Sequence, residues 1–116
     1  MTSELNASGR RLGPLSKIPV GEGRTFIVDG VELAVFRTRN GDLFAVQSRC
    51  PHRGGLLADG LLGDGKIVCP LHGYTFELTS GQSLGQQPCE SITTYSLEVT
   101  EEGDLLIDLQ RASCAG

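Results

Sequence analysis

The chain has 116 residues, a formal net charge of −4 and a pI near 5.0. This length allows one domain with one modest core, and 39% hydrophobic and 21% charged residues are ordinary for a soluble globular protein. The acidic balance argues against nucleic-acid binding. With no apolar run of 18 residues and no signal-peptide pattern at residues 1–8, we expect a cytoplasmic protein without a membrane segment.

The first half of the chain has the pattern of antiparallel hairpins. Residues 1–11 are mostly small and polar, and we expect them to be flexible. Asp29-Gly30 and Asn40-Gly41 are hairpin-turn signals. Val31, Leu33 and Val35 alternate and are predicted to share one face of a strand. The strands expected here are 12–20, an edge strand because of its two prolines, then 24–28, 31–37 and 43–46.

Residues 48–81 interrupt this rhythm and are expected to form an inserted module. Short strands are predicted at 66–69 and 74–78, and the hairpin pattern resumes at 92–100 and 105–109. No segment shows a sustained helical period, so we predict an all-β fold. The expected domain covers residues 12–110, followed by a flexible tail at 111–116.

Two short boxes carry the chemistry. The first is Cys50-Pro51-His52, and the second, after sixteen intervening residues, is Cys69-Pro70-Leu71-His72. The two histidines of the chain and two of its four cysteines lie in these boxes. Each box combines a thiolate with an imidazole, which is typical of metal ligands. The prolines and adjoining glycines shape turns that bring backbone N–H groups close to a bound group.

Three interpretations of the boxes compete. The residues could be buried thiols and hydrogen-bonded histidines without a metal, although four such residues in two matched loops are improbable by chance. A structural zinc site usually pairs two cysteines and then two histidines on a helix, whereas each box here mixes the two types. A two-iron, two-sulfur cluster with two cysteines on one iron and two histidines on the other suits the pattern best.

The two boxes at this separation resemble the cluster-binding boxes of the Rieske iron–sulfur family, and the similarity extends over about residues 12–109. The resemblance implies a 2Fe-2S cluster whose inner iron is held by Cys50 and Cys69. His52 and His72 would then hold the outer, exposed iron. It also implies antiparallel sheets with the cluster at one tip.

Such a cluster transfers one electron and converts no substrate by itself. An oxygenase would need a second iron held by two histidines and a carboxylate, and no histidine remains for it. We therefore expect an electron-transfer subunit without a catalytic residue of its own, working with a redox partner protein. Cys89 and Cys114 are expected to be free thiols.

The resemblance points to two soluble branches. The segments 33–37, 50–55 and 58–60 look slightly closer to the small subunit of assimilatory NAD(P)H nitrite reductase, which we take as the first hypothesis. The alternative is the ferredoxin of aromatic-ring-hydroxylating dioxygenases, which works with a ferredoxin reductase and an oxygenase. A redox sensor or zinc-stabilised interaction module is a third. High-potential members have a serine and a tyrosine where this chain has Tyr74 and Phe76, so we expect a low potential.

Charge placement suggests where a partner docks. Residues 90–108 contain six acidic side chains and no basic one. Basic residues gather in sequence near the boxes, at Arg37, Arg39, Arg49, Arg53 and Lys66. They predict a basic rim that meets an acidic partner, with ordinary solvated charges as the alternative. In the same way, the leucine pairs at 56–57 and 61–62 could shield the cluster or fill the core.

Overall fold

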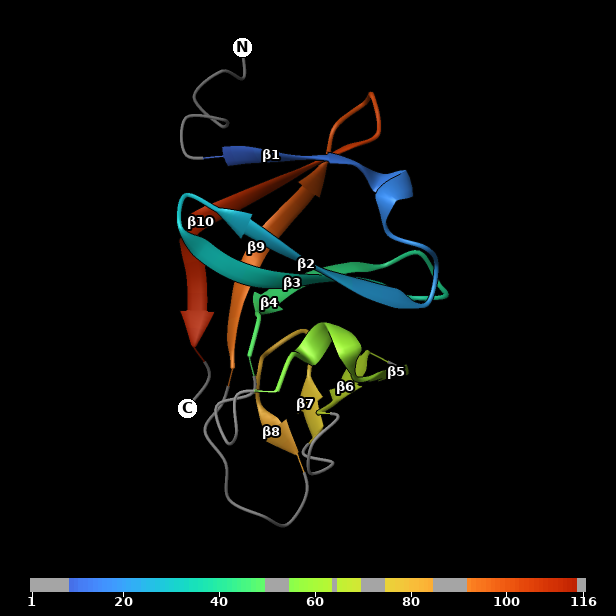
Figure 1. Cartoon of the computed structure of the whole chain (residues 1–116), viewed down its shortest axis with the longest axis vertical. Coiled ribbons are helices and arrows are strands. Elements are labelled where there is room, and N and C mark those ends of the chain that lie inside the picture. Colours follow the sequence, from blue (N-terminus) through green and yellow to red (C-terminus); the bar gives the residue numbers. More distant parts are fainter. Residues whose placement is uncertain (1–8, 50–54, 64, 70–74, 85–91, 115–116) are drawn as a thin grey trace.

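The computed structural model describes residues 9–49, 55–63, 65–69, 75–84 and 92–114. Most of the strands form one six-stranded antiparallel sheet in the order β1-β10-β9-β4-β3-β2, called the large sheet here (Figure 1). Its strands are β1 (Gly9–Pro14), β2 (Glu22–Val28), β3 (Val31–Arg37), β4 (Leu43–Gln47), β9 (Thr93–Val99) and β10 (Asp104–Cys114). Residues 24–28, 31–37, 43–46 and 92–100, predicted as strands, correspond to β2, β3, β4 and β9.

A second antiparallel sheet, the small sheet, lies below the large one in Figure 1 and has the order β5-β6-β7-β8. Its strands are β5 (Leu61–Gly63), β6 (Lys66–Val68), β7 (Thr75–Glu77) and β8 (Ser83–Leu84). The predicted strands at 66–69 and 74–78 are therefore present, whereas β5 and β8 were not predicted. The all-β fold with an inserted module is confirmed.

The Asp29-Gly30 turn has the geometry that its sequence predicts. Both residues have positive φ angles, 52° and 80°, which is the requirement of a type I′ hairpin turn. Val28 pairs with Val31 across this turn, and the ladder continues to Glu22 and Arg37. The turn thus sets the register that places Leu33 and Val35 on one face of β3.

The predicted edge strand at 12–20 is wrong in its bounds. The strand β1 spans Gly9–Pro14, and a short 3₁₀ helix, η2 (Leu15–Lys17), follows it. Pro14 has no N–H to continue a ladder, and the next N–H, that of Leu15, donates to the carbonyl of Gly103 at 2.8 Å. Residues 9–11, expected to be flexible, are part of the large sheet.

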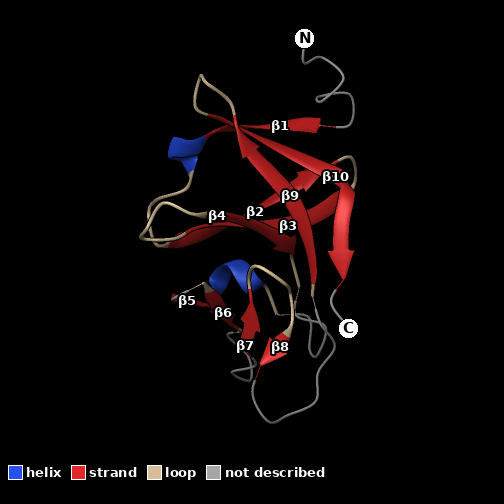
Figure 2. Cartoon of the chain, turned by 180° about the vertical axis from the view of Figure 1, so that it is seen from behind, coloured by secondary structure: helices blue, strands red, loops and turns tan. Residues whose placement is uncertain are grey.

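The C-terminal strand is longer than predicted. Strand β10 continues past 105–109 to Cys114, because a register shift between Asp108 and Ala112 lets it pair again with β9 at residues 93–95. Residues 111–114, expected in the flexible tail, thus belong to the large sheet. The start of β10 pairs with β1, and its end runs down beside the start of β9 in Figure 2.

The large sheet curls, so that its two edges approach each other. Arg10 on β1 forms an ion pair of 2.7 Å with Asp29 in the turn between β2 and β3. The concave side encloses one hydrophobic core, formed by Leu12, Ile18, Leu33, Val35, Ala45, Leu105 and Ile107. Leu33 and Val35, which the alternation places on one face of β3, are thus buried together in this core.

A second core fills the space between the two sheets and supports the module. Ala34 and Phe36 of β3, which the alternation places on the outer face of the curled sheet, are fully buried in it. Its other members are Val46, Leu57, Ile67, Cys69, Phe76, Leu78 and Ile92. Strand β3 is therefore buried on both faces, because the small sheet covers the side that would otherwise meet solvent.

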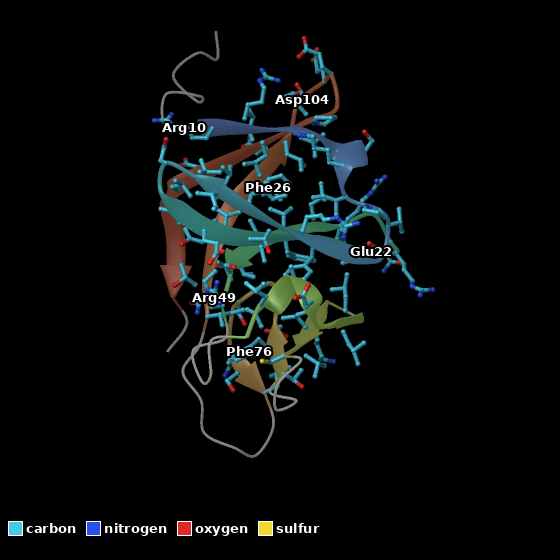
Figure 3. All side chains as sticks on the ribbon, viewed as in Figure 1. Arg10, Glu22, Phe26, Arg49, Phe76 and Asp104 are labelled. Atoms are coloured by element: carbon cyan, nitrogen blue, oxygen red, sulfur yellow. The ribbon has the colours of Figure 1, made fainter. Side chains whose placement is uncertain are left out.

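The molecule is elongated, with extents of 46 × 26 × 21 Å. Asp104 lies near one end of the long axis and Phe76 lies in the small sheet toward the other (Figure 3). In the part of the chain that the structure describes, no helix is long and apolar enough to cross a membrane.

Candidate metal centre

Cys69 is the one predicted ligand that falls within the described residues. It directly follows β6, is 2% exposed, and belongs to the core between the two sheets. Cys50, His52 and His72 lie outside the described residues, as do Arg53, Tyr74 and Cys89. Among the residues described there is accordingly no group of three or more metal-binding side chains.

The chain reaches the first box through a fixed backbone path. Strand β4 ends at Gln47, and Arg49 then forms an isolated antiparallel bridge with Leu56 on the other side of the box. The N–H of Leu57 donates to the carbonyl of Ser48 at 2.8 Å. Residues 48–49 and 56–57 thus hold together the two ends of the loop that carries Cys50 and His52.

Gln47 adds a side-chain clamp to this path. Its Nε2 donates to the carbonyl of Arg49 at 2.7 Å, and its Oε1 accepts from the N–H of Thr93, also at 2.7 Å. The amide therefore ties the residue before Cys50 to the start of β9, which lies 46 positions after Gln47 in the chain. The sequence pattern contains no signal for this role, because it depends on which strand lies beside β4.

The second box is approached through the middle of the small sheet. Val68, the residue before Cys69, pairs with Leu61 on one side and Thr75 on the other. Gly60 packs on the carbonyl of Val68 so closely that a Cβ there would lie 2.1 Å from the oxygen. The position of Cys69 is therefore set by both neighbouring strands and by a glycine nine residues earlier.

The leucine pairs between the boxes separate into core and surface. Leu57 begins the short helix η3 (Leu57–Asp59) and is fully buried in the core between the sheets. Leu62 is partly buried and packs against the same core. Leu61 is 75% exposed. The core-filling interpretation is thus correct for Leu57, and Leu61 instead lies on the outer surface of β5.

The basic residues near the boxes differ in what they contact. Arg49 is paired with Glu32 at 3.1 Å at the junction between the two sheets (Figure 3), and Arg37 donates to the carbonyl of Ile18 at 3.0 Å. Arg39 and Lys66 are exposed, and Arg39 lines an open cleft of about 790 Å³ between the β3–β4 turn and the small sheet. Of the predicted basic rim, three members are exposed among the described residues, Arg39, Arg49 and Lys66, and Arg49 is partly neutralised by Glu32.

Three acidic side chains of the 90–108 segment lie at the end of the large sheet away from the module. Glu101 and Glu102 are exposed in the turn between β9 and β10, and Asp104 follows at the upper end of the molecule in Figure 3. Asp104 and Glu102 form ion pairs with Arg11. The acidic end and the cysteine-bearing module thus lie toward opposite ends of the long axis.

The surroundings of Cys69 suit a metal-bound thiolate. A thiolate ligand in an iron–sulfur centre requires exclusion of water and nearby hydrogen-bond donors. Cys69 is nearly inaccessible, and the hydroxyl of Ser48, two residues before Cys50, is buried without a partner within the described structure. The structure is thus a small all-β domain whose buried, loop-borne cysteine lies beside an apolar layer, as a ligand of an iron–sulfur centre requires.

Comparison with known proteins names the family. The family model described as the Rieske [2Fe-2S] domain matches residues 10–96 of this chain. The chain is 35% identical over 100 residues to the 3-phenylpropionate/cinnamic acid dioxygenase ferredoxin subunit of Escherichia coli K12, covering 85% of this chain and 92% of that subunit. The chain therefore belongs to the Rieske family, and its cofactor is a 2Fe-2S cluster of the Rieske type.

Solved structures agree on the fold. The ferredoxin of carbazole 1,9a-dioxygenase from Nocardioides aromaticivorans superposes with a TM-score of 0.79 at 24% identity, covering 87% of this chain and 97% of that one. A candidate NADH-dependent nitrite reductase small subunit from Mycobacterium tuberculosis gives 0.78 at 25% identity, covering 93% and 96%. The expected Rieske architecture is therefore confirmed, and both soluble branches named above share it.

Proposed function

We propose that this protein carries single electrons between partner proteins, with Cys50 and Cys69 holding one iron of its cluster and His52 and His72 the other. The membership of the Rieske family and the buried position of Cys69 support this assignment. When bound, the cluster supplies a one-electron redox couple. The chain's contribution is to hold the two boxes on a rigid pair of sheets and to exclude water from the cysteine side.

Residue counting supports a role without substrate conversion. The chain has two histidines, and both are assigned to the cluster. A mononuclear iron site of the oxygenase kind needs two more, together with a carboxylate. The reaction that consumes the electron therefore takes place on a partner.

We further propose that the partner system is an aromatic-ring-hydroxylating dioxygenase. The observation that supports this is the 35% identity over 92% of a dioxygenase ferredoxin subunit. The nitrite reductase small subunit, favoured by the short segments around the first box, stays the second candidate because a structure of that description covers 93% of this chain. The comparison with the dioxygenase ferredoxin changes the order of the two hypotheses.

The test is reconstitution with each partner. The protein is added to a dioxygenase system lacking its ferredoxin, and separately to a nitrite reductase large subunit lacking its small subunit. We expect NADH-dependent formation of the dihydrodiol in the first assay, and none with Cys69→Ser. Nitrite reduction that requires the wild-type protein, with no dihydrodiol formed, would reverse the assignment.

A low reduction potential accompanies this proposal. Phe76 is fully buried in the core between the sheets and has no hydroxyl to donate toward a sulfur. The potential is therefore expected toward the lower end of the range of about −150 to +300 mV for Rieske centres. Voltammetry on the isolated protein at neutral pH measures it directly.

A further inference from the structure

The hydroxyl of Ser48 is buried without a hydrogen-bond partner. Ser48 is 3% exposed. Among the buried side-chain oxygen and nitrogen atoms of the described residues, its Oγ alone makes no hydrogen bond. Buried hydroxyls almost always find a partner, because an unpaired one loses its bonds to water and gains nothing in return. The orphaned hydroxyl therefore marks a place where a further acceptor belongs.

Ser48 lies on the buried side of the segment that leads into the first box. Strand β4 ends at Gln47, and Ser48 directly follows it. Ser48 is buried, like Val46 two positions earlier, which belongs to the core between the two sheets. Its neighbours Gln47 and Arg49 are more accessible. Burial therefore alternates from Val46 to Arg49, and Ser48 shares the buried side with Val46, whose core also contains Cys69.

The backbone around Ser48 leaves its side chain available. Its carbonyl accepts from the N–H of Leu57, and the following carbonyl, of Arg49, accepts from Gln47. These bonds hold residues 47–49 in place without using the hydroxyl. A donor fixed in this way is oriented before any cofactor binds, and costs little reorganisation when one does.

We propose that Ser48 Oγ donates a hydrogen bond to a sulfur of the 2Fe-2S cluster or of its cysteine ligands, and thereby raises the reduction potential. The inference rests on the ligand set proposed above. Sulfur is the acceptor that this cofactor brings to the cysteine-lined side of the module. Reduction adds negative charge to the cluster, so a fixed donor stabilises the reduced form more than the oxidised form. Ser48 thus tunes the cofactor by direct contact, from a position two residues before the first box.

The test compares Ser48→Ala with wild type in the isolated, cluster-loaded protein. We expect the equilibrium constant for reduction to fall about tenfold, which corresponds to about 59 mV for a one-electron couple. Voltammetry reports only loaded molecules, so partial iron loss does not affect the value. Resonance Raman spectra should also lose part of the shift that deuterium exchange causes in the iron–sulfur modes.

Two further variants separate this role from a general effect on folding. Ser48→Thr keeps the hydroxyl and should hold the wild-type potential, and Ser48→Cys, a weaker donor of similar size, should fall between wild type and alanine. The control is Thr38→Val, which removes another buried hydroxyl, one that accepts from the N–H of Asp42 at 3.0 Å. It should lower stability without changing the potential.

The outcomes are decisive in both directions. An unchanged potential in Ser48→Ala would overturn the proposal, and would indicate that the hydroxyl meets a water molecule instead. If alanine prevents cluster loading, an unchanged potential in Ser48→Cys overturns it equally. A wild-type protein without iron, sulfide or a Rieske signal would refute the proposed function itself, before any variant is measured.

Discussion

Gly60 offers the sharpest test of how the scaffold positions the second box. It follows η3 with ordinary backbone angles, φ −82° and ψ −175°, so an L-residue meets no conformational strain there. The obstacle is spatial, because a Cβ would lie 2.1 Å from the carbonyl oxygen of Val68. We therefore predict that Gly60→Ala is destabilising for steric reasons alone.

The magnitude follows from what must move. To reach even 3.0 Å, the two groups must separate by about 0.9 Å, and the obstructing atom is backbone within the β5–β6–β7 ladder. Overpacking of this kind costs about 1–3 kcal/mol, and the rigid ladder places it near the upper value. Loss of unfolded-state entropy on replacing glycine offsets about 0.4–1 kcal/mol. We expect net destabilisation of about 2 kcal/mol.

Gly63→Ala is the matched control. Gly63 lies three residues further on, at the end of β5, and a Cβ added there would meet no atom within 4 Å. This substitution should leave the free energy of unfolding unchanged or raise it by about 0.4–1 kcal/mol. The two alanine variants should therefore differ by roughly 3 kcal/mol in urea unfolding.

The displaced carbonyl belongs to the residue before Cys69, so Gly60→Ala should also release iron to a chelator faster than wild type. Gly63→Ala should not. Unfolding free energies within about 0.5 kcal/mol of each other would show that the close approach at Gly60 does not position this strand. If Gly60→Ala released iron no faster than wild type, retention of the cluster would not depend on the stability of the small sheet.

Substitutions at four other positions test the site and its support. Cys69→Ser should abolish the Rieske absorption and the bound iron, whereas Cys89→Ala should keep both. Iron loss in Cys89→Ala would mean that the proposed ligand set is wrong. Phe36→Ala should cost about 3–5 kcal/mol in urea unfolding, because it empties a fully buried site between the sheets; a cost below about 1 kcal/mol would argue against that packing. Gln47→Leu removes two hydrogen bonds and should cost about 2 kcal/mol in urea unfolding. Equal stability of Gln47→Leu and wild type would exclude the clamp.

The turn, the strand face and the type of ligand could be predicted from the sequence because each depends on residues close together in the chain or on residue type. Asp29-Gly30 predicts a turn with two positive φ angles, and the structure has them. The alternation of Val31, Leu33 and Val35 predicts one apolar face, and Leu33 and Val35 are fully buried in the core of the curled large sheet. The mixture of cysteine and histidine in two spaced boxes predicted the cofactor for the same reason, since ligand type follows from residue type.

The limits of β1 and β10 depended on contacts between distant segments. Residues 9–11 become ordered sheet because β10 offers them a partner, and the strand ends where Leu15 turns its N–H to Gly103. At the other end, β10 extends to Cys114 because it resumes pairing with β9 after an irregularity. Composition alone cannot predict such pairings, because small and polar residues enter a strand whenever a neighbour satisfies their backbone groups.

The burial of the second face of β3 depends on tertiary structure alone. Ala34 and Phe36 occupy the face that a two-sided hairpin would expose, and they are buried because the small sheet packs against it. The roles of Gln47, Ser48 and Gly60 have the same origin. Each depends on segments that come together only in the folded chain: strand β9 beside Gln47, the surroundings that bury Ser48, and the carbonyl of Val68 against Gly60. Residue types thus indicated which cofactor binds, while the pairing of distant strands and the packing of the two sheets determined how the segments that lead into the cysteine boxes are held.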